Sequence, residues 1–131
     1  MGQQQLLLIV LGVIIVGIAV VVGINIFSAS SSNANRDAVV SDLTNLASMA
    51  QQYYRKPTAM GGGGNSFVGF ADNKVPASLL SNANGTYSIG TPTATSVVIT
   101  GTGKENGFDG STAIDIDMTV YADSVTTTNN N

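Results

Sequence analysis

The sequence contains no cysteine, no histidine and no tryptophan, and only 10% of its residues are charged. Without cysteine and histidine the chain forms no disulfide, ligates neither zinc nor haem through those residues, and lacks the commonest general base. The acidic residues that gather in one stretch are Glu105, Asp109, Asp115 and Asp117. Their spacing matches no calcium-loop signature, and Asp115 and Asp117 suit a solvated strand face. We therefore expect no enzyme, no metal or cofactor, and no small-molecule substrate.

Positive charge is equally scarce, and the formal net charge is −3. The basic residues are Arg36, Arg55, Lys56, Lys74 and Lys104. Binding to nucleic acid needs clustered lysines and arginines, and here only Arg55 and Lys56 are adjacent. We therefore expect no nucleic-acid partner.

Charge is absent from the N-terminal end, where no charged side chain precedes Arg36. Residues 6–24 read LLLIVLGVIIVGIAVVVGI, which is nineteen residues that are all apolar or glycine. A helix of this length crosses a bilayer core of roughly 30 Å. Exposing these side chains to water would forgo roughly 1.5–3 kcal/mol for each. The run must therefore lie in lipid or against copies of itself. In either place it is expected to be a helix, because neither environment offers hydrogen-bond partners to unpaired backbone groups.

Small residues interrupt the aliphatic run at Gly12, Gly17 and Gly23. Each glycine costs roughly 1 kcal/mol relative to alanine in a helix interior. Ala19 and Gly23 form a small-xxx-small pair, which allows two helices to approach closely. Glycine is also generally common in membrane helices, so these glycines either allow close helix packing or simply reflect the usual composition of such helices.

A second, amphipathic helical segment is predicted over residues 36–56. Its apolar stripe, at spacings of 4, 3, 4 and 3 residues, is Val39, Leu43, Leu46, Ala50 and Tyr53. Asn33 or Asn35 is expected to cap its start, and Pro57 to end it. The intervening residues 28–35 are weak helix formers, so they form either a flexible joint or a loosened stretch of one long helix.

The rest of the chain reads as an antiparallel meander. A glycine loop at 61–64 and a short helical turn at 75–80 precede strands expected at 86–89, 95–102 and 113–122. The last strand alternates, with Ile114, Ile116, Met118 and Val120 on the face expected to pack on the amphipathic helix. Phe67, Val68 and Phe70 are also expected in the core. The polar tail at 126–131 is expected to be disordered or to lie flat on the surface.

These elements predict an α+β fold, in which a long N-terminal helix packs on a small antiparallel sheet of three to four strands. We expect an apolar helix at 1–27, an amphipathic continuation at 28–57, and a loop-and-sheet head at 58–131. Residues 28–131 would form one globular domain, which is enough chain for one small core.

This order of parts resembles the type IV pilin superfamily: a short polar N-terminus, an apolar half-helix, an amphipathic half-helix, a glycine-rich loop and a small sheet. Gln5 stands directly before Leu6, at the fifth position where pilins carry an acidic residue. The resemblance implies a homopolymeric filament on the cell surface, whose subunits wait in the inner membrane before assembly. The residues expected in the filament core are Met1, Gln5, Leu6, Gly12, Gly17, Ala19 and Gly23.

The sequence departs from the pilin pattern in four ways. Gln5 replaces a glutamate that is thought to pair with a neighbouring subunit's N-terminal amine, and a neutral acceptor makes a weaker bond than a charged one. A basic leader ending in glycine is absent, so either it was removed before residue 1 or Met1 is the true start. The proline often found in the apolar half is absent, as is the C-terminal cysteine pair. Together these predict a divergent relative.

Two other readings remain open. A single-pass membrane protein with a small extracellular domain also explains the apolar run, although no lysine or arginine flanks fix its orientation. A pseudopilin of a secretion machine would share the predicted fold. Separately, Asn84-Gly85-Thr86 is a candidate N-glycosylation sequon.

Overall fold

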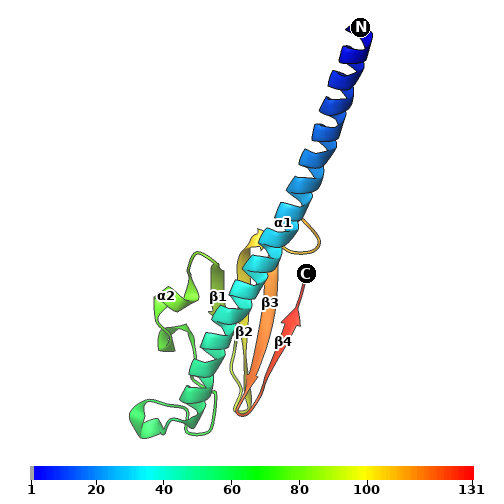
Figure 1. The fold of residues 1–131 in the computed structure, drawn as a ribbon. Coiled ribbons are helices and arrows are strands. Elements are labelled where there is room, and N and C mark those ends of the chain that lie inside the picture. The colour runs from blue at the N-terminus through cyan, green and yellow to red at the C-terminus, as the bar shows by residue number, and fades with distance from the viewer. Residues whose placement is uncertain (1) are drawn as a thin grey trace.

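One helix, α1 (Gly2–Arg55), runs the length of the molecule and packs by its C-terminal part against a four-stranded sheet (Figure 1). The structure is a computed structural model that describes residues 2–131, so the prediction for Met1 lies outside the described residues. At 1.5 Å per residue, the 54 residues of α1 span roughly 80 Å. The predicted α+β class, with a long N-terminal helix on a small antiparallel sheet, is confirmed.

Short elements connect α1 to the sheet. They are η1 (Thr58–Met60), η2 (Asp72–Lys74) and α2 (Ala77–Leu80). The sheet contains β1 (Gly85–Ile89), β2 (Ser96–Asn106), β3 (Ala113–Tyr121) and β4 (Val125–Asn129). The strands lie in the order β1-β2-β3-β4 and every neighbouring pair is antiparallel. The predicted meander is therefore present, with β2 extended past a register shift between Thr102 and Asn106.

Residues 28–35 belong to α1 without a break, so no flexible joint or helix cap lies there. The head, defined as residues 58–131, engages the polar side chains that would otherwise compete for the helix backbone. Ser32 donates its hydroxyl to the carbonyl of Asn106. Asn35 donates to the carbonyl of Asn84 and accepts from the backbone N–H of Lys104. The prediction that Asn33 or Asn35 caps a helix start is wrong, because Asn35 joins the helix to the head instead.

The four-glycine loop closes the C-terminal end of α1. The N–H groups of Gly63 and Gly64 donate to the carbonyls of Tyr53 and Lys56 at 2.8 and 2.9 Å. The last turn of a helix leaves such carbonyls without partners inside the helix. A side chain at position 63 would place its Cβ 1.8 Å from the carbonyl oxygen of Ser66, so only glycine fits there.

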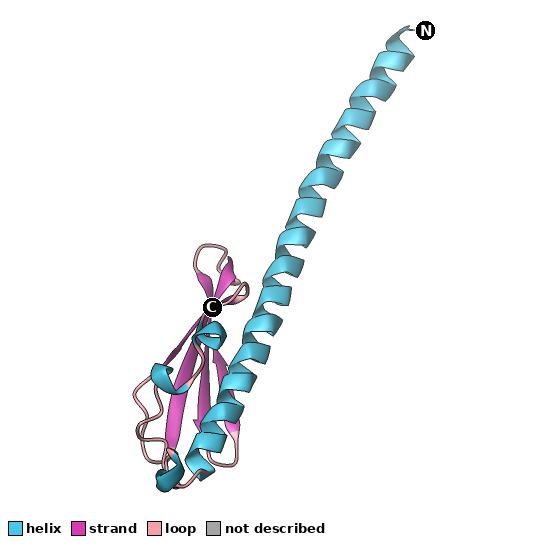
Figure 2. Cartoon of the chain, turned by 90° about the vertical axis from the view of Figure 1, so that its left-hand side faces the viewer, coloured by secondary structure: helices cyan, strands magenta, loops and turns pink. Residues whose placement is uncertain are grey.

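The core lies between α1 and one face of the sheet, as the edge-on view in Figure 2 shows. From α1 it takes Val39, Leu43, Leu46 and Ala50, and from β3 it takes Ile114, Ile116, Met118 and Val120. Tyr53 is only partly buried, with its ring centroid 5.4 Å from that of Phe70. All eight aliphatic side chains named here are at most 2% exposed, and Phe67, Phe70 and Val75 from the segment between α1 and the sheet also belong to this core.

Two local expectations are wrong. Phe67 and Phe70 are buried, but Val68 is 59% exposed. Val68 and Gly69 form the tip of a turn in which the N–H of Phe70 donates to the carbonyl of Phe67 at 3.0 Å, so Val68 faces away from the core. The polar tail is not disordered: residues 125–129 form β4. A two-residue turn brings the N–H of Tyr121 to the carbonyl of Ser124 at 2.8 Å and starts this hairpin. Paired β-branched residues then extend it along β3.

Substitution of Leu43, a fully buried side chain on α1, tests this core. Leu43→Ala is expected to lower the free energy of unfolding by about 3 kcal/mol, because it removes apolar contacts and leaves a cavity. Thr44→Ala, at the next and exposed position, should change it by less than about 0.5 kcal/mol. Denaturant unfolding followed by tyrosine fluorescence on the detergent-solubilised protein measures both. Equal effects would contradict the assigned helix face.

Candidate functional site

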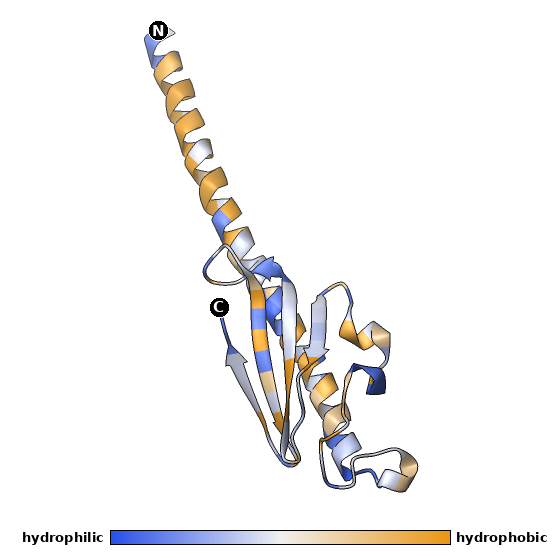
Figure 3. Ribbon diagram, turned by 180° about the vertical axis from the view of Figure 1, so that it is seen from behind, coloured by the Kyte–Doolittle hydropathy of each residue, from blue (hydrophilic) through white to orange (hydrophobic). Residues whose placement is uncertain are grey.

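The most unusual surface of the molecule is the apolar half of α1, defined as residues 2–27. Every residue in it is exposed, and its large hydrophobic side chains are between 49% and 74% exposed. Figure 3 shows it as a nearly continuous hydrophobic rod beyond the head. The helix is long and apolar enough to cross a membrane. Apolar patches on water-soluble monomers seldom exceed a few hundred Å², so this surface requires lipid or other protein.

The N-terminal end of this rod is polar but uncharged. Gln3, Gln4 and Gln5 precede Leu6, and all three are exposed within the helix. An amide side chain both donates and accepts hydrogen bonds, so glutamine can satisfy several kinds of partner without carrying a charge into an apolar surrounding. Gln5 and Leu6 both lie on the exposed surface of α1.

Three small residues and the polar Gln5 share one side of the apolar half of α1. They are Gln5, Gly12, Ala19 and Gly23. At 100° per residue they fall within about 40° of one another, whereas Gly17 lies about 140° away from Gly12. We call the four residues the small-residue seam. The sequence showed the pair of Ala19 and Gly23, but the heptad spacing that joins Gln5 and Gly12 to this pair was not recognised there.

The seam lies nearly opposite the head. Val39, which faces the sheet, falls about 180° around the helix from Gly12 by the same count. A Cβ atom added at Gly12, Gly17 or Gly23 would meet nothing within 4 Å. These glycines are therefore not required by packing within residues 2–131, and any packing role must involve a neighbouring molecule.

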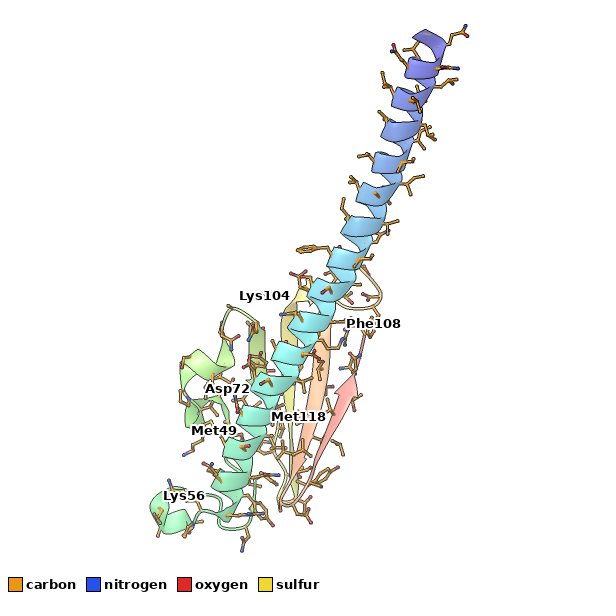
Figure 4. All side chains as sticks on the ribbon, in the orientation of Figure 1. Met49, Lys56, Asp72, Lys104, Phe108 and Met118 are labelled. Atoms are coloured by element: carbon orange, nitrogen blue, oxygen red, sulfur yellow. The ribbon has the colours of Figure 1, made fainter. Side chains whose placement is uncertain are left out.

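The junction between rod and head is held by Arg36 and the loop between β2 and β3. The guanidinium carbon of Arg36 lies 4.2 Å from the ring centroid of Phe108, a cation–π contact. Arg36 also donates through Nη1 to the side-chain oxygen of Asn129. Phe108 is 71% exposed beside α1, where the helix leaves the head (Figure 4). Sequence analysis did not anticipate this contact, which joins residues more than seventy positions apart.

Beside this junction lies an open cleft of about 550 Å³. It is lined by α1, by the end of β2 and by the loop that follows β2, through Ser28, Ala29, Ser32, Asn33, Lys104, Glu105, Asn106, Gly107, Phe108 and Gly110. Lys104 and Glu105 are the charged residues in its lining. Nearby, Asp109 accepts from the hydroxyl and the backbone N–H of Thr112 and from the backbone N–H of Ser111, and these hydrogen bonds lower the pKa of its carboxyl group. Within residues 2–131, histidine, cysteine, aspartate and glutamate form no group of three that could hold a metal ion.

A polar cluster fastens α1 to the start of β1. Asp42 accepts from the hydroxyl of Tyr87 at 2.5 Å and from the side-chain amides of Asn82 and Asn84 at 3.0 and 3.1 Å. Burial acts to raise the pKa of Asp42, but the three hydrogen bonds outweigh it and lower the pKa below 3.8. Burial and the neighbouring carboxylate raise the pKa of Tyr87 above 10.0. Because the amide of Asn84 is used here, glycosylation at Asn84 stays a prediction that would compete with this cluster.

Comparison with known proteins identifies no relative. The chain matches no family model, no curated protein and no solved structure. The fold therefore defines the class of protein: an α+β chain whose membrane-capable N-terminal helix packs on a small antiparallel sheet, an arrangement compatible with a pilin-like fold.

The Asp42 cluster predicts how stability depends on pH. The lowered pKa of Asp42 means that its contribution is present above pH 3.8 and is lost as the pH falls through the folded pKa. The raised pKa of Tyr87 means that its contribution is present below pH 10.0 and is lost as the pH rises. Denaturant unfolding should therefore show a plateau between these limits.

Asp42→Asn is the matched variant. It should lower the free energy of unfolding at pH 7 by about 1 kcal/mol, since a charged acceptor is lost from a partly exposed site. It should also flatten the acid limb of the stability profile. An unchanged acid limb would show that other carboxylates control it.

Proposed function

We propose that the chain is a structural subunit of an extracellular, type IV pilus-like filament that polymerises through the apolar half of α1. One observation carries this proposal: the apolar half leaves the head as an unbroken helix on which every residue is exposed. Such a surface is stable only in lipid or among other apolar helices. A bundle of identical helices, with the heads outside, provides the second environment.

The length and rigidity of α1 favour a filament over a simple membrane anchor. About 20 residues suffice to cross a bilayer, and an anchor needs no rigid connection to its head. Here α1 has 54 residues in all and extends well beyond its apolar half. Ser32, Asn35 and Arg36 hold it to the head shortly after the apolar half ends. A rigid connection sets the position of each head relative to its helix, as a regular polymer requires.

The position of the small-residue seam determines which side of α1 would face outward in the proposed filament. Because the seam lies nearly opposite the sheet, the head and the closest helix contacts would occupy opposite sides of α1. Heads would then face outward while Gly12, Ala19 and Gly23 face neighbouring helices. Small residues allow close backbone approach, which is the main source of helix association where lipid and protein are equally apolar.

Before assembly the apolar half would be stored in the inner membrane. Assembly then exchanges lipid contacts for helix contacts, so the gain comes from packing and from hydrogen bonds at the polar end. Gln5 would supply neutral hydrogen bonds to a neighbouring N-terminus in place of an ion pair. The proposal assigns a structural and not a catalytic role, with cell adhesion as one use of such a filament.

A membrane-anchored protein or a pseudopilin is the second candidate, and the membrane-capable helix favours it directly. Fractionation of expressing cells and negative-stain microscopy of sheared surface material separate the two candidates. The filament proposal expects thin fibres that contain the full-length chain outside the cells. Protein found only in membranes, and only as monomers in detergent, would overturn it.

Close packing in the filament is tested by Gly12→Leu and Gly17→Leu. Gly12→Leu should reduce polymerised protein at least tenfold, and Gly17→Leu, which lies outside the small-residue seam, should reduce it less. Both should leave membrane insertion unchanged, because a leucine blocks close helix approach but is equally soluble in lipid. Val13→Leu, an aliphatic exchange beside Gly12, is the control and should polymerise normally. Equal loss of insertion and polymerisation in the glycine variants would contradict close packing.

A further inference from the structure

The strand β4 forms one edge of the sheet, and its outer side has no partner among residues 2–131. Hydrogen bonds on its inner side define which groups face outward. Tyr121 bonds to Ser124, and Asn130 bonds to Asp115. In an antiparallel pair, hydrogen-bonded positions alternate with positions whose backbone groups point away.

The alternation leaves three residues facing outward. They are Val125, Thr127 and Asn129. Each directs one N–H and one C=O away from β3. All five residues of β4 are exposed, so no loop or helix of the described chain covers this edge.

The opposite edge of the sheet is covered. On β1, Thr86 pairs with Ser81, and the N–H of Ile89 donates to the carboxylate of Asp72 at 3.0 Å. Soluble proteins usually protect an open edge with lysine, proline or a bulge. The sequence of β4 is VTTTN, which has none of these and no charge. The difference between the two edges indicates that β4 is left free to pair.

We propose that β4 pairs antiparallel with β4 of a second copy of this chain, around a two-fold axis at Thr127. In this register Thr127 lies opposite its own counterpart, and Val125 lies opposite the partner's Asn129. All three outward-facing residues then become hydrogen-bonded pairs at once, so the edge complements itself. A parallel arrangement would need an offset of one residue and would lose the two-fold symmetry.

The charges around the edge agree with this pairing. No charged residue lies on β4, so two copies do not repel each other along the strand. Asp123 lies just before the strand, and Arg36 is bonded to Asn129 at its far end. Antiparallel pairing brings the Arg36 end of one copy, where Asp117 also lies against Asn130, next to the Asp123 end of the other.

The pairing also sets the direction of the two molecules. β4 runs roughly along α1, as Figure 1 shows, so antiparallel strands place the two apolar halves at opposite ends of the pair. The two helices therefore cannot lie in the same membrane or in the same polar filament. Resting on the proposed function, the pair joins heads of two oppositely directed filaments and so bundles them.

Charge substitution at the symmetry position tests the pairing on the full chain in detergent. Thr127→Lys and Thr127→Glu each place like charges opposite each other, and each should weaken dimerisation at least tenfold in sedimentation velocity. An equimolar mixture of the two variants should restore dimers, and added salt should weaken the mixed dimer. The exposed side chain and outward backbone at Thr127 leave the bonds between β3 and β4 intact, which an unchanged unfolding midpoint checks.

Thr126→Lys and Thr126→Glu are the matched controls, because Thr126 would lie opposite the partner's Thr128 and not opposite itself. These variants should lose less dimer, and mixing them should restore less. Monomeric wild-type chain at every concentration, or a Thr127 mixture that stays monomeric, overturns the proposal.

The bundling role has its own readout. Filaments that fail to bundle in Thr127→Lys but bundle in the mixture support it. Dimers in detergent without any filaments would leave β4 pairing in place and overturn the proposed function alone. Filaments without dimers or bundles would overturn the pairing alone.

Discussion

The constraint on which the whole structure depends is that the apolar half of α1 must stay out of water. The head offers no cover for it, since residues 2–30 are all exposed. Hydrocarbon or neighbouring helices must supply the missing contacts, and a helix is the backbone form that satisfies its own hydrogen bonds in either. The uncharged N-terminal end and the late first charge at Arg36 follow from the same requirement.

The second half of α1 attaches the head rigidly to the apolar half. Its buried stripe, centred on Leu43 and Leu46, covers one sheet face, and Asp42 adds a polar clamp to β1. Asn35 and Arg36 hold the helix to the head shortly after the apolar half ends at Phe27. The head therefore follows the helix wherever the apolar half is placed, and the open edge of β4 is carried at a set orientation with it.

Much of this fold could be predicted from the sequence because its periodicities are strong. Three patterns each indicate the secondary structure of their own segment: the apolar run, the stripe from Val39 to Tyr53, and the alternation from Ile114 to Val120. At residues 28–35 the weak helix formers left a flexible joint and one long helix both open, and at the tail the sequence predicted no strand. In both places long-range hydrogen bonds decided the outcome: Asn35 bonds to β2, and the tail pairs with β3 as β4.

The sequence by itself determined the helix, its two halves and the wet and dry faces of β3, because these depend on spacing along the chain. Only the tertiary structure decided that α1 is unbroken and that Phe108 stacks on Arg36. It also decided that the small-residue seam points away from the head and that β4 leaves an open edge. These features depend on contacts between residues far apart in sequence, and no local propensity contains that information.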